Sequence, residues 1–97
     1  MEAIQDRTHA LLDRAEDALV QLIGDLEKAK ADGVPEARLG GIFEFQRKAQ
    51  WRVDCINAEN AMDFHAPQEA ARVLGEAIDF SRQGQLALRD IRDKQAK

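Results

Sequence analysis

Two prolines, Pro35 and Pro67, divide the chain into three segments, and each segment repeats apolar residues at the spacing of an α-helix. Proline fits the first turn of a helix but not its interior, so each proline is expected to begin a new helix. The sequence therefore predicts an all-α fold of three long helices, over about residues 2–31, 35–61 and 67–94.

The first expected helix has an apolar stripe wide enough for neighbours on more than one side. The stripe comprises Ile4, Leu11, Leu12, Ala15, Ala18, Leu19, Val20, Leu22, Ile23, Leu26 and Ala29. Gly33 follows, and glycine readily takes the left-handed conformation that ends many helices. We therefore expect a tight turn at Gly33, after which the second helix runs back along the first.

The second and third expected helices each contain a stretch that conflicts with simple packing. Gly40 and Gly41 cost the second helix about 2 kcal/mol of helix propensity. They favour close approach of another backbone, with a kink or a frayed first turn as the alternative. Residues 81–85 of the third helix are polar and lack a good inner residue. We expect the bundle to loosen there or a partner to cover it.

The short connections between the helices make neighbouring helices antiparallel, so the predicted architecture is an up-down-up bundle with residues 1–97 as a single domain. Helices of this length extend about 40–45 Å. Three such slender helices bury little surface, and the wide stripe of the first one favours self-association. We expect a homodimer through the long helices.

Composition excludes several classes of protein. The 97 residues carry a net charge of −4, which disfavours a nucleic-acid surface. No apolar run approaches the roughly 18 residues of a membrane span, and the N-terminus lacks the pattern of a signal peptide. The single cysteine, Cys55, cannot form an intrachain disulfide, and its simplest interpretation is a buried small residue.

Familiar catalytic and metal sites are also not expected from the sequence. A di-metal bundle needs two Glu-x-x-His pairs, and residues 6–9 imitate one only distantly. Zinc-binding spacing is missing, no base lies near Cys55 in sequence, and Gly40-Gly41 follows no strand. An autonomous enzyme is therefore not the expected function.

The two histidines differ in their surroundings. His9 lies mid-surface on the first expected helix and is expected to be solvated. His65 stands at the corner between the second and third helices, next to Phe64 and shortly before Pro67. A capping or packing role is the common one at such a corner. An imidazole held at a rigid helix start also suits an axial ligand of haem iron. Periodicity leaves both interpretations open.

Several short stretches together resemble the C-terminal helical region of the ammonia-forming cytochrome c nitrite reductases, the pentahaem cytochrome c552 family. These stretches are Arg7-Thr8, Leu11-Leu12, Ala49-Gln50-Trp51-Arg52 with Asp54, Asn60, Phe64-His65-Ala66-Pro67 and Glu69. The resemblance covers most of the chain. The order and spacing of the two later motifs give it its specificity.

The resemblance implies a periplasmic parent enzyme that carries several c-type haems and reduces nitrite to ammonium with six electrons. It implies that the long C-terminal helices form a homodimer interface. It further implies that His65 is an axial ligand of a haem iron, with Trp51 and Arg52 in the cofactor's surroundings. The catalytic residues and haem-attachment motifs of the family lie upstream of this region.

The sequence departs from the family pattern at three positions and in one motif. Val53 replaces a second Trp, Ala61 a common Gly, and Gln68 a frequent Glu. The chain has no Cys-x-x-Cys-His, so it cannot attach haem c covalently. We expect an excised domain that works with the haem-bearing N-terminal portion of its parent. The alternative is a free-standing cytosolic helical module that binds a partner protein through its first helix.

Overall fold

The computed structural model describes the backbone of residues 2–61 and 67–95 and the side chains of residues 9–59 and 69–94. The described chain forms three α-helices and no strands, which confirms the all-helical prediction: α1 (Glu2–Ala31), α2 (Glu36–Ala61) and α3 (Pro67–Gln95). Helix α2 begins one residue after the expected Pro35, and α3 ends one residue after the expected Lys94.

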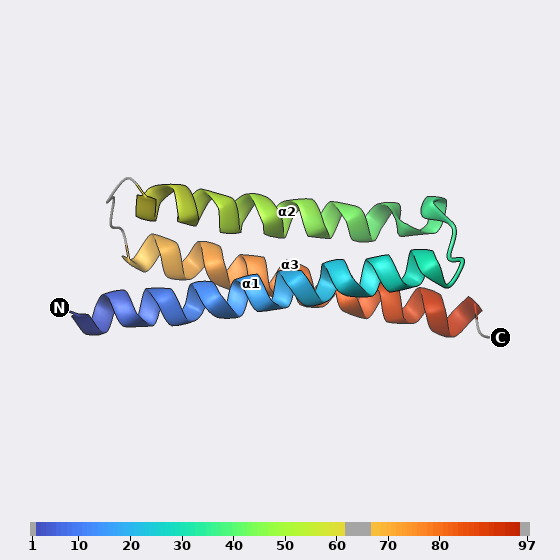
Figure 1. The fold of residues 1–97 in the computed structure, drawn as a ribbon, viewed down its shortest axis with the longest axis horizontal. Helices are drawn as coiled ribbons and strands as arrows, with labels where there is room; N and C mark the ends of the chain where they lie inside the picture. Colours follow the sequence, from blue (N-terminus) through green and yellow to red (C-terminus); the bar gives the residue numbers. More distant parts are fainter. Residues whose placement is uncertain (1, 62–66, 96–97) are drawn as a thin grey trace.

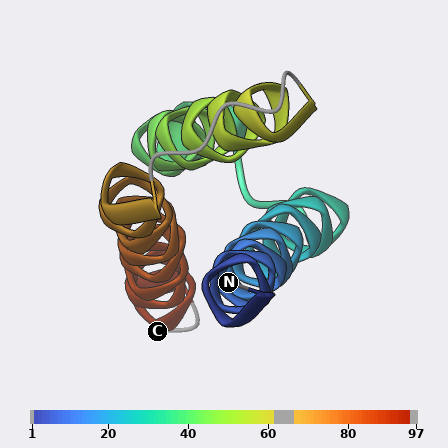
Figure 2. The ribbon, with the colours of Figure 1, turned by 90° about the vertical axis from the view of Figure 1, so that its left-hand side faces the viewer.

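The helices lie side by side in a slender bundle with principal extents of 53 × 19 × 18 Å. Helices α1 and α3 run in one direction and α2 runs in the other, so the two chain ends point to opposite ends of the bundle (Figure 1). Viewed along its length, the three helices occupy the corners of a triangle, and each packs against the other two (Figure 2). None of them, over its described residues, combines the length and apolar character needed to cross a membrane.

The turn between α1 and α2 forms as the glycine predicts. Gly33 has a φ of 93°, in the left-handed region. The backbone N–H of Val34 donates to the carbonyl of Ala29 at 3.0 Å, and that of Gly33 donates to the carbonyl of Lys30 at 3.1 Å. This pair of bonds is the Schellman motif, and Val34 is buried against the core as that motif favours.

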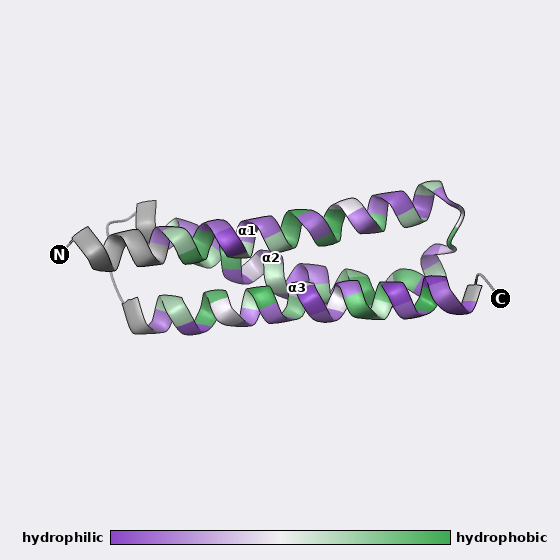
Figure 3. Ribbon diagram, turned by 90° about the horizontal axis from the view of Figure 1, so that it is seen from below, coloured by the Kyte–Doolittle hydropathy of each residue, from purple (hydrophilic) through white to green (hydrophobic). Residues whose placement is uncertain are grey.

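The core consists of two clusters of buried side chains, one toward each end of the bundle, and Figure 3 shows the apolar positions repeating along each helix. The cluster toward the α2–α3 end contains Leu12, Ala15, Leu19, Ala49, Val53, Ile56, Ala70, Leu74 and Ala77. The cluster toward the Gly33 turn contains Leu22, Leu26, Ala29, Val34, Leu39, Ile42 and Leu88. Buried alanines let the helix axes approach closely, which suits a small core.

The middle of α3 packs tightly, so the expectation that the bundle loosens over residues 81–85 is wrong. Ser81 is fully buried, and its hydroxyl donates to the carbonyl of Ala77 at 2.9 Å. A Cβ atom at Gly84 would lie 2.9 Å from Cδ2 of Leu22 and 3.3 Å from Cβ of Phe45. The two buried residues of this stretch, Ser81 and Gly84, are small, and α1 and α2 approach α3 closely at Gly84.

The close approach expected at Gly40 and Gly41 is absent. A Cβ atom at either position would meet nothing within 4 Å, and both residues are exposed inside the continuous helix α2. The glycine pair is therefore not explained by packing within the described chain. Val20 on α1 is also exposed, which shows that the stripe of α1 is wider than its two neighbours cover.

Candidate functional site

Trp51 lies on the outer face of α2, where 66% of it is exposed. An open depression beside its indole ring is lined by Trp51 itself and by Glu44, Arg47, Lys48 and Arg52. Three of these four charged residues are cations. The structure thus presents a flat aromatic surface to solvent with positive charge around it.

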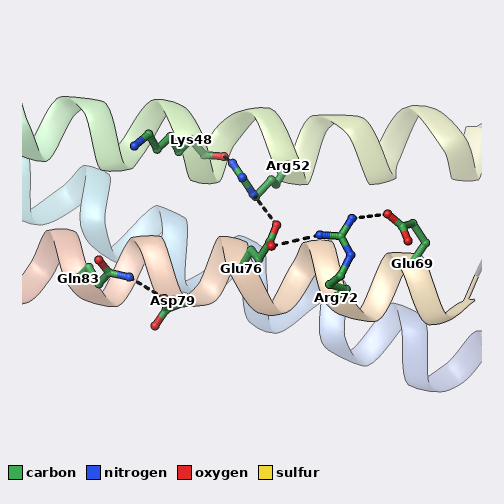
Figure 4. A network of polar contacts seen from close by, with 7 residues as sticks. All are labelled: Lys48, Arg52, Glu69, Arg72, Glu76, Asp79 and Gln83. Atoms are coloured by element: carbon green, nitrogen blue, oxygen red, sulfur yellow. Dashed lines mark hydrogen bonds and ion pairs between the residues drawn. The ribbon is translucent and has the colours of Figure 1, made fainter.

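Arg52, the next residue along the chain, points toward α3 instead (Figure 4). Its Nε donates to Oε1 of Glu76 at 3.0 Å, and its Nη1 donates to the backbone carbonyl of Lys48 at 3.0 Å. Only 22% of its side chain is exposed. The sequence predicts Trp51 and Arg52 together as cofactor-binding residues, and both line this depression, while the guanidinium of Arg52 also contacts Glu76 on α3.

The polar contacts continue along α3 from Glu76. Arg72 donates to Oε2 of Glu76 at 3.2 Å and also to Glu69, near the start of the helix. The hydrogen bond from Arg52 lowers the pKa of Glu76, and the positive charges of Arg72 and Arg52 act in the same direction. The hydrogen bond to Glu69, followed by its negative charge, raises the pKa of Arg72. Both pKa shifts favour the charged forms of Glu76 and Arg72.

Phe80 lies under this network and joins α2 to α3. The guanidinium carbon of Arg52 is 4.7 Å from the centre of its ring, and Nζ of Lys48 is 5.5 Å from it. The ring of Phe45 on α2 lies 6.2 Å away, tilted by 34°. Stacking on an aromatic face restrains a guanidinium as well as attracting it.

His65, the predicted axial ligand, lies outside the described residues, as do its neighbours Phe64 and Ala66. The described helix ends on either side are Ala61 and Pro67. The assignment of His65 as an iron ligand therefore stays a prediction.

His9 and Cys55 lie among the described residues. His9 is exposed, as expected for a solvated side chain on α1. Cys55 is half-buried rather than buried. Successive residues of an α-helix differ by about 100° around the helix axis, so the side chain of Cys55 points away from the core that its neighbour Ile56 faces. Within the described part of the chain, no three His, Cys, Asp or Glu side chains gather as a metal site would require.

A second depression lies along α1 and α3 on another part of the surface. Its lining includes Lys28, Arg82, Leu86, Arg89 and Asp93, and two of its lining residues on α3 form hydrogen bonds with α1. These bonds run from Arg82 to Gln21 at 2.7 Å and from Gln85 to Asp25 at 3.0 Å. No functional residue had been predicted on this surface.

Sequence reasoning missed the roles of Glu76 and Phe80. Both lie beside the inner stripe of α3 rather than on it, so their contacts with Arg52 depend on how α2 and α3 face each other. The family resemblance alone singles out the adjacent pair Trp51 and Arg52. Nothing in the sequence shows that Trp51 faces solvent while Arg52 contacts α3.

Comparisons with known proteins bear on the whole chain. The sequence profile of the cytochrome c552 family matches residues 1–97. A cytochrome c-552 of Parabacteroides distasonis is 32% identical over 83 residues, which are 86% of this chain and 17% of that protein. A cytochrome c-552 of Bacteroides fragilis is 31% identical over 87 residues, which are 90% of this chain and 18% of that protein. No solved structure matches. The chain thus spans less than a fifth of the length of these relatives, and the match over all of its residues shows that it belongs to the cytochrome c552 family.

Proposed function

We propose that this chain is the C-terminal dimerisation and haem-supporting domain of a multihaem c-type nitrite reductase, without catalytic activity in isolation. The observation that carries the proposal is the family match over all 97 residues, together with the 17–18% share of the relatives' length that the chain spans. The parent enzyme would be periplasmic and reduce nitrite to ammonium with six electrons. The same match favours this function over that of a free-standing cytosolic interaction module.

The residues present suit the support of a haem but not its attachment. The chain has one cysteine and no Cys-x-x-Cys-His, so the thioether bonds of haem c would be made by the N-terminal portion of the parent. His65 would donate an imidazole nitrogen to the iron as an axial ligand. The haem, when bound, supplies electron transfer.

The exposed face of Trp51 supports the same function. The indole offers a flat apolar surface, and the cations around it, Arg47 and Lys48, are suited to the carboxylates at the edge of a haem. Arg52 would act in the same surroundings from the α3 side, where its guanidinium is already held by Glu76.

We also propose that the domain forms a homodimer through its long helices. Val20 on α1 and Leu86 on α3 are 65% and 66% exposed, and large aliphatic side chains at such exposure are suited to burial by a second protein surface. Sedimentation of the purified chain should give a dimer that Leu86→Glu or Val20→Glu weakens. Gln83→Glu, which adds the same charge elsewhere on α3, serves as the control. A wild-type monomer at all concentrations would count against the dimer.

The parent enzyme provides the test of the main proposal. The complete gene should be expressed in a host that matures c-type cytochromes, and the product should be assayed for covalent haem and for reduction of nitrite to ammonium. We expect several haems per chain and activity. A gene product without covalently bound haem would overturn the proposal.

A further inference from the structure

Four charged side chains form a continuous chain of contacts from α2 to the first turns of α3. Arg52 on α2 contacts Glu76, Glu76 contacts Arg72, and Arg72 contacts Glu69 (Figure 4). Among the ion pairs of the described residues, the pair of Arg52 and Glu76 is the one that joins α2 to α3. These contacts therefore restrain one helix against the other.

The restraint acts near the helix ends that flank the corner. Arg52 precedes the end of α2 at Ala61 by nine residues, and Glu76 follows the start of α3 at Pro67 by nine residues. The two side chains thus meet at the same level of an antiparallel pair of helices. A slip of one helix along the other would break their contact.

The geometry distinguishes Arg52 from an ordinary surface cation. Exposed ion pairs contribute little, because ordering two long side chains costs entropy that a weak attraction barely offsets. Arg52 is ordered by three separate groups: the ring of Phe80, the carbonyl of Lys48 and the carboxylate of Glu76. Its side chain is also mostly covered. The ring of Phe80 and the carbonyl of Lys48 thus hold the guanidinium of Arg52 in the position from which it donates to Glu76.

We propose that Arg52 and Glu76 are positioning residues that set α2 against α3 and so fix where the connecting residues 62–66 begin and end. Arg72 and Glu69 extend this restraint to the first turns of α3. The pair would thereby set the separation of Ala61 and Pro67, the described helix ends that flank His65 in the sequence, and its effect on a haem ligand there rests on the haem-supporting function proposed above.

Hydrogen exchange measured by mass spectrometry tests the positioning role without any haem. Glu76→Gln keeps the shape of the side chain but removes its charge. We expect amide exchange in peptides that cover residues 57–71 to become about threefold faster or more. Exchange at the Gly33 turn, at the other end of the bundle, should stay unchanged.

Asp79→Asn is the matched control, since it removes one carboxylate from the same helix and affects only a contact within α3, with Gln83. It should leave exchange over residues 57–71 at the wild-type rate. Unchanged exchange in Glu76→Gln would overturn the proposal, and so would an increase that is equal at both ends of the bundle or equal in the two variants.

Haem binding supplies the second readout. The chain is titrated with haemin in the presence of imidazole, and the low-spin signals are compared by electron paramagnetic resonance. We expect Glu76→Gln to shift these signals and Asp79→Asn to leave them unchanged. If the exchange result holds but the wild-type chain binds no haem, the positioning role stands and the haem-supporting function fails. If the wild type binds haem and Glu76→Gln changes neither exchange nor spectrum, the positioning role fails and the haem-supporting function stands.

Discussion

Gly84 on α3 lies directly against Leu22 on α1, so that a Cβ atom at Gly84 would be 2.9 Å from Cδ2 of Leu22. Leu22 is itself fully buried, so its methyl groups could move away from a Cβ atom at Gly84 only by displacing other atoms of the core. The glycine is thus required by packing and not by backbone conformation.

Gly84→Ala should lower the free energy of unfolding by about 1 kcal/mol, because overpacking costs about 1–3 kcal/mol and the gain in helix propensity returns about 1 kcal/mol. Gly24→Ala is the control, since a Cβ atom there meets nothing within 4 Å. It should raise stability by about 0.5–1 kcal/mol. Urea unfolding measures both, and equal stabilisation by the two substitutions would contradict the packing described at Gly84.

Acid should weaken the junction of α2 and α3. Since the folded-state pKa of Glu76 is lowered, its contribution is fully present above the ordinary pKa of 4.5 and is lost as the pH falls below that value through the lowered pKa. The charged groups that face Glu76 are Arg52 and Arg72, and Arg72 also donates to Glu69. The loss of stability on acidification should therefore be smaller in Glu76→Gln than in the wild type. Urea unfolding at about pH 7 and about pH 4 compares them. An identical loss in both proteins would exclude Glu76 as a contributor.

Phe80→Leu should destabilise the bundle by about 1–2 kcal/mol, because it removes an aromatic contact with Phe45 and the ring that two cations contact. Phe43→Leu is the comparison, because Phe43 carries one such cation, Lys30, at 4.8 Å. Thermal unfolding should show the larger loss for Phe80→Leu. A larger loss of stability for Phe43→Leu would contradict the view that the contacts of the Phe80 ring stabilise the bundle more than those of the Phe43 ring.

Trp51→Ala should change the stability of the isolated chain by less than about 0.5 kcal/mol, since the indole is mostly exposed. The same substitution should weaken the binding of haemin, if the indole packs against the cofactor. Unfolding in urea and titration with haemin separate the two effects. A large loss of stability would mean that Trp51 is a structural residue of α2.

Much of the fold follows from particular residues of the sequence. Pro35, Gly33 and Pro67 mark the helix boundaries because proline and glycine restrict or permit backbone conformations locally, without reference to the rest of the chain. The inner stripes of α1 and α2 follow from helical periodicity in the same way.

Residues whose role depends on another helix could not be read from the sequence. Ser81 and Gly84 look like a weak stretch because they are polar or small, but both are buried, and Gly84 packs against the side chains of Leu22 and Phe45 across the bundle. Gly40 is the opposite example, because a Cβ atom there would meet nothing within 4 Å and packing does not require a glycine. For the candidate site, sequence resemblance singled out Trp51 and Arg52 but could not show that Arg52 faces α3.

Titration of the chain with haemin in the presence of imidazole shows whether His65 holds haem iron. His65→Ala is compared with His9→Ala, which removes the exposed histidine on α1. We expect the wild type and His9→Ala to bind haemin with the same affinity and His65→Ala to bind it more weakly, because free imidazole can replace the lost ligand in the spectrum but not its attachment to the chain. Retention of the wild-type affinity in His65→Ala would contradict the assignment of His65 as an iron ligand.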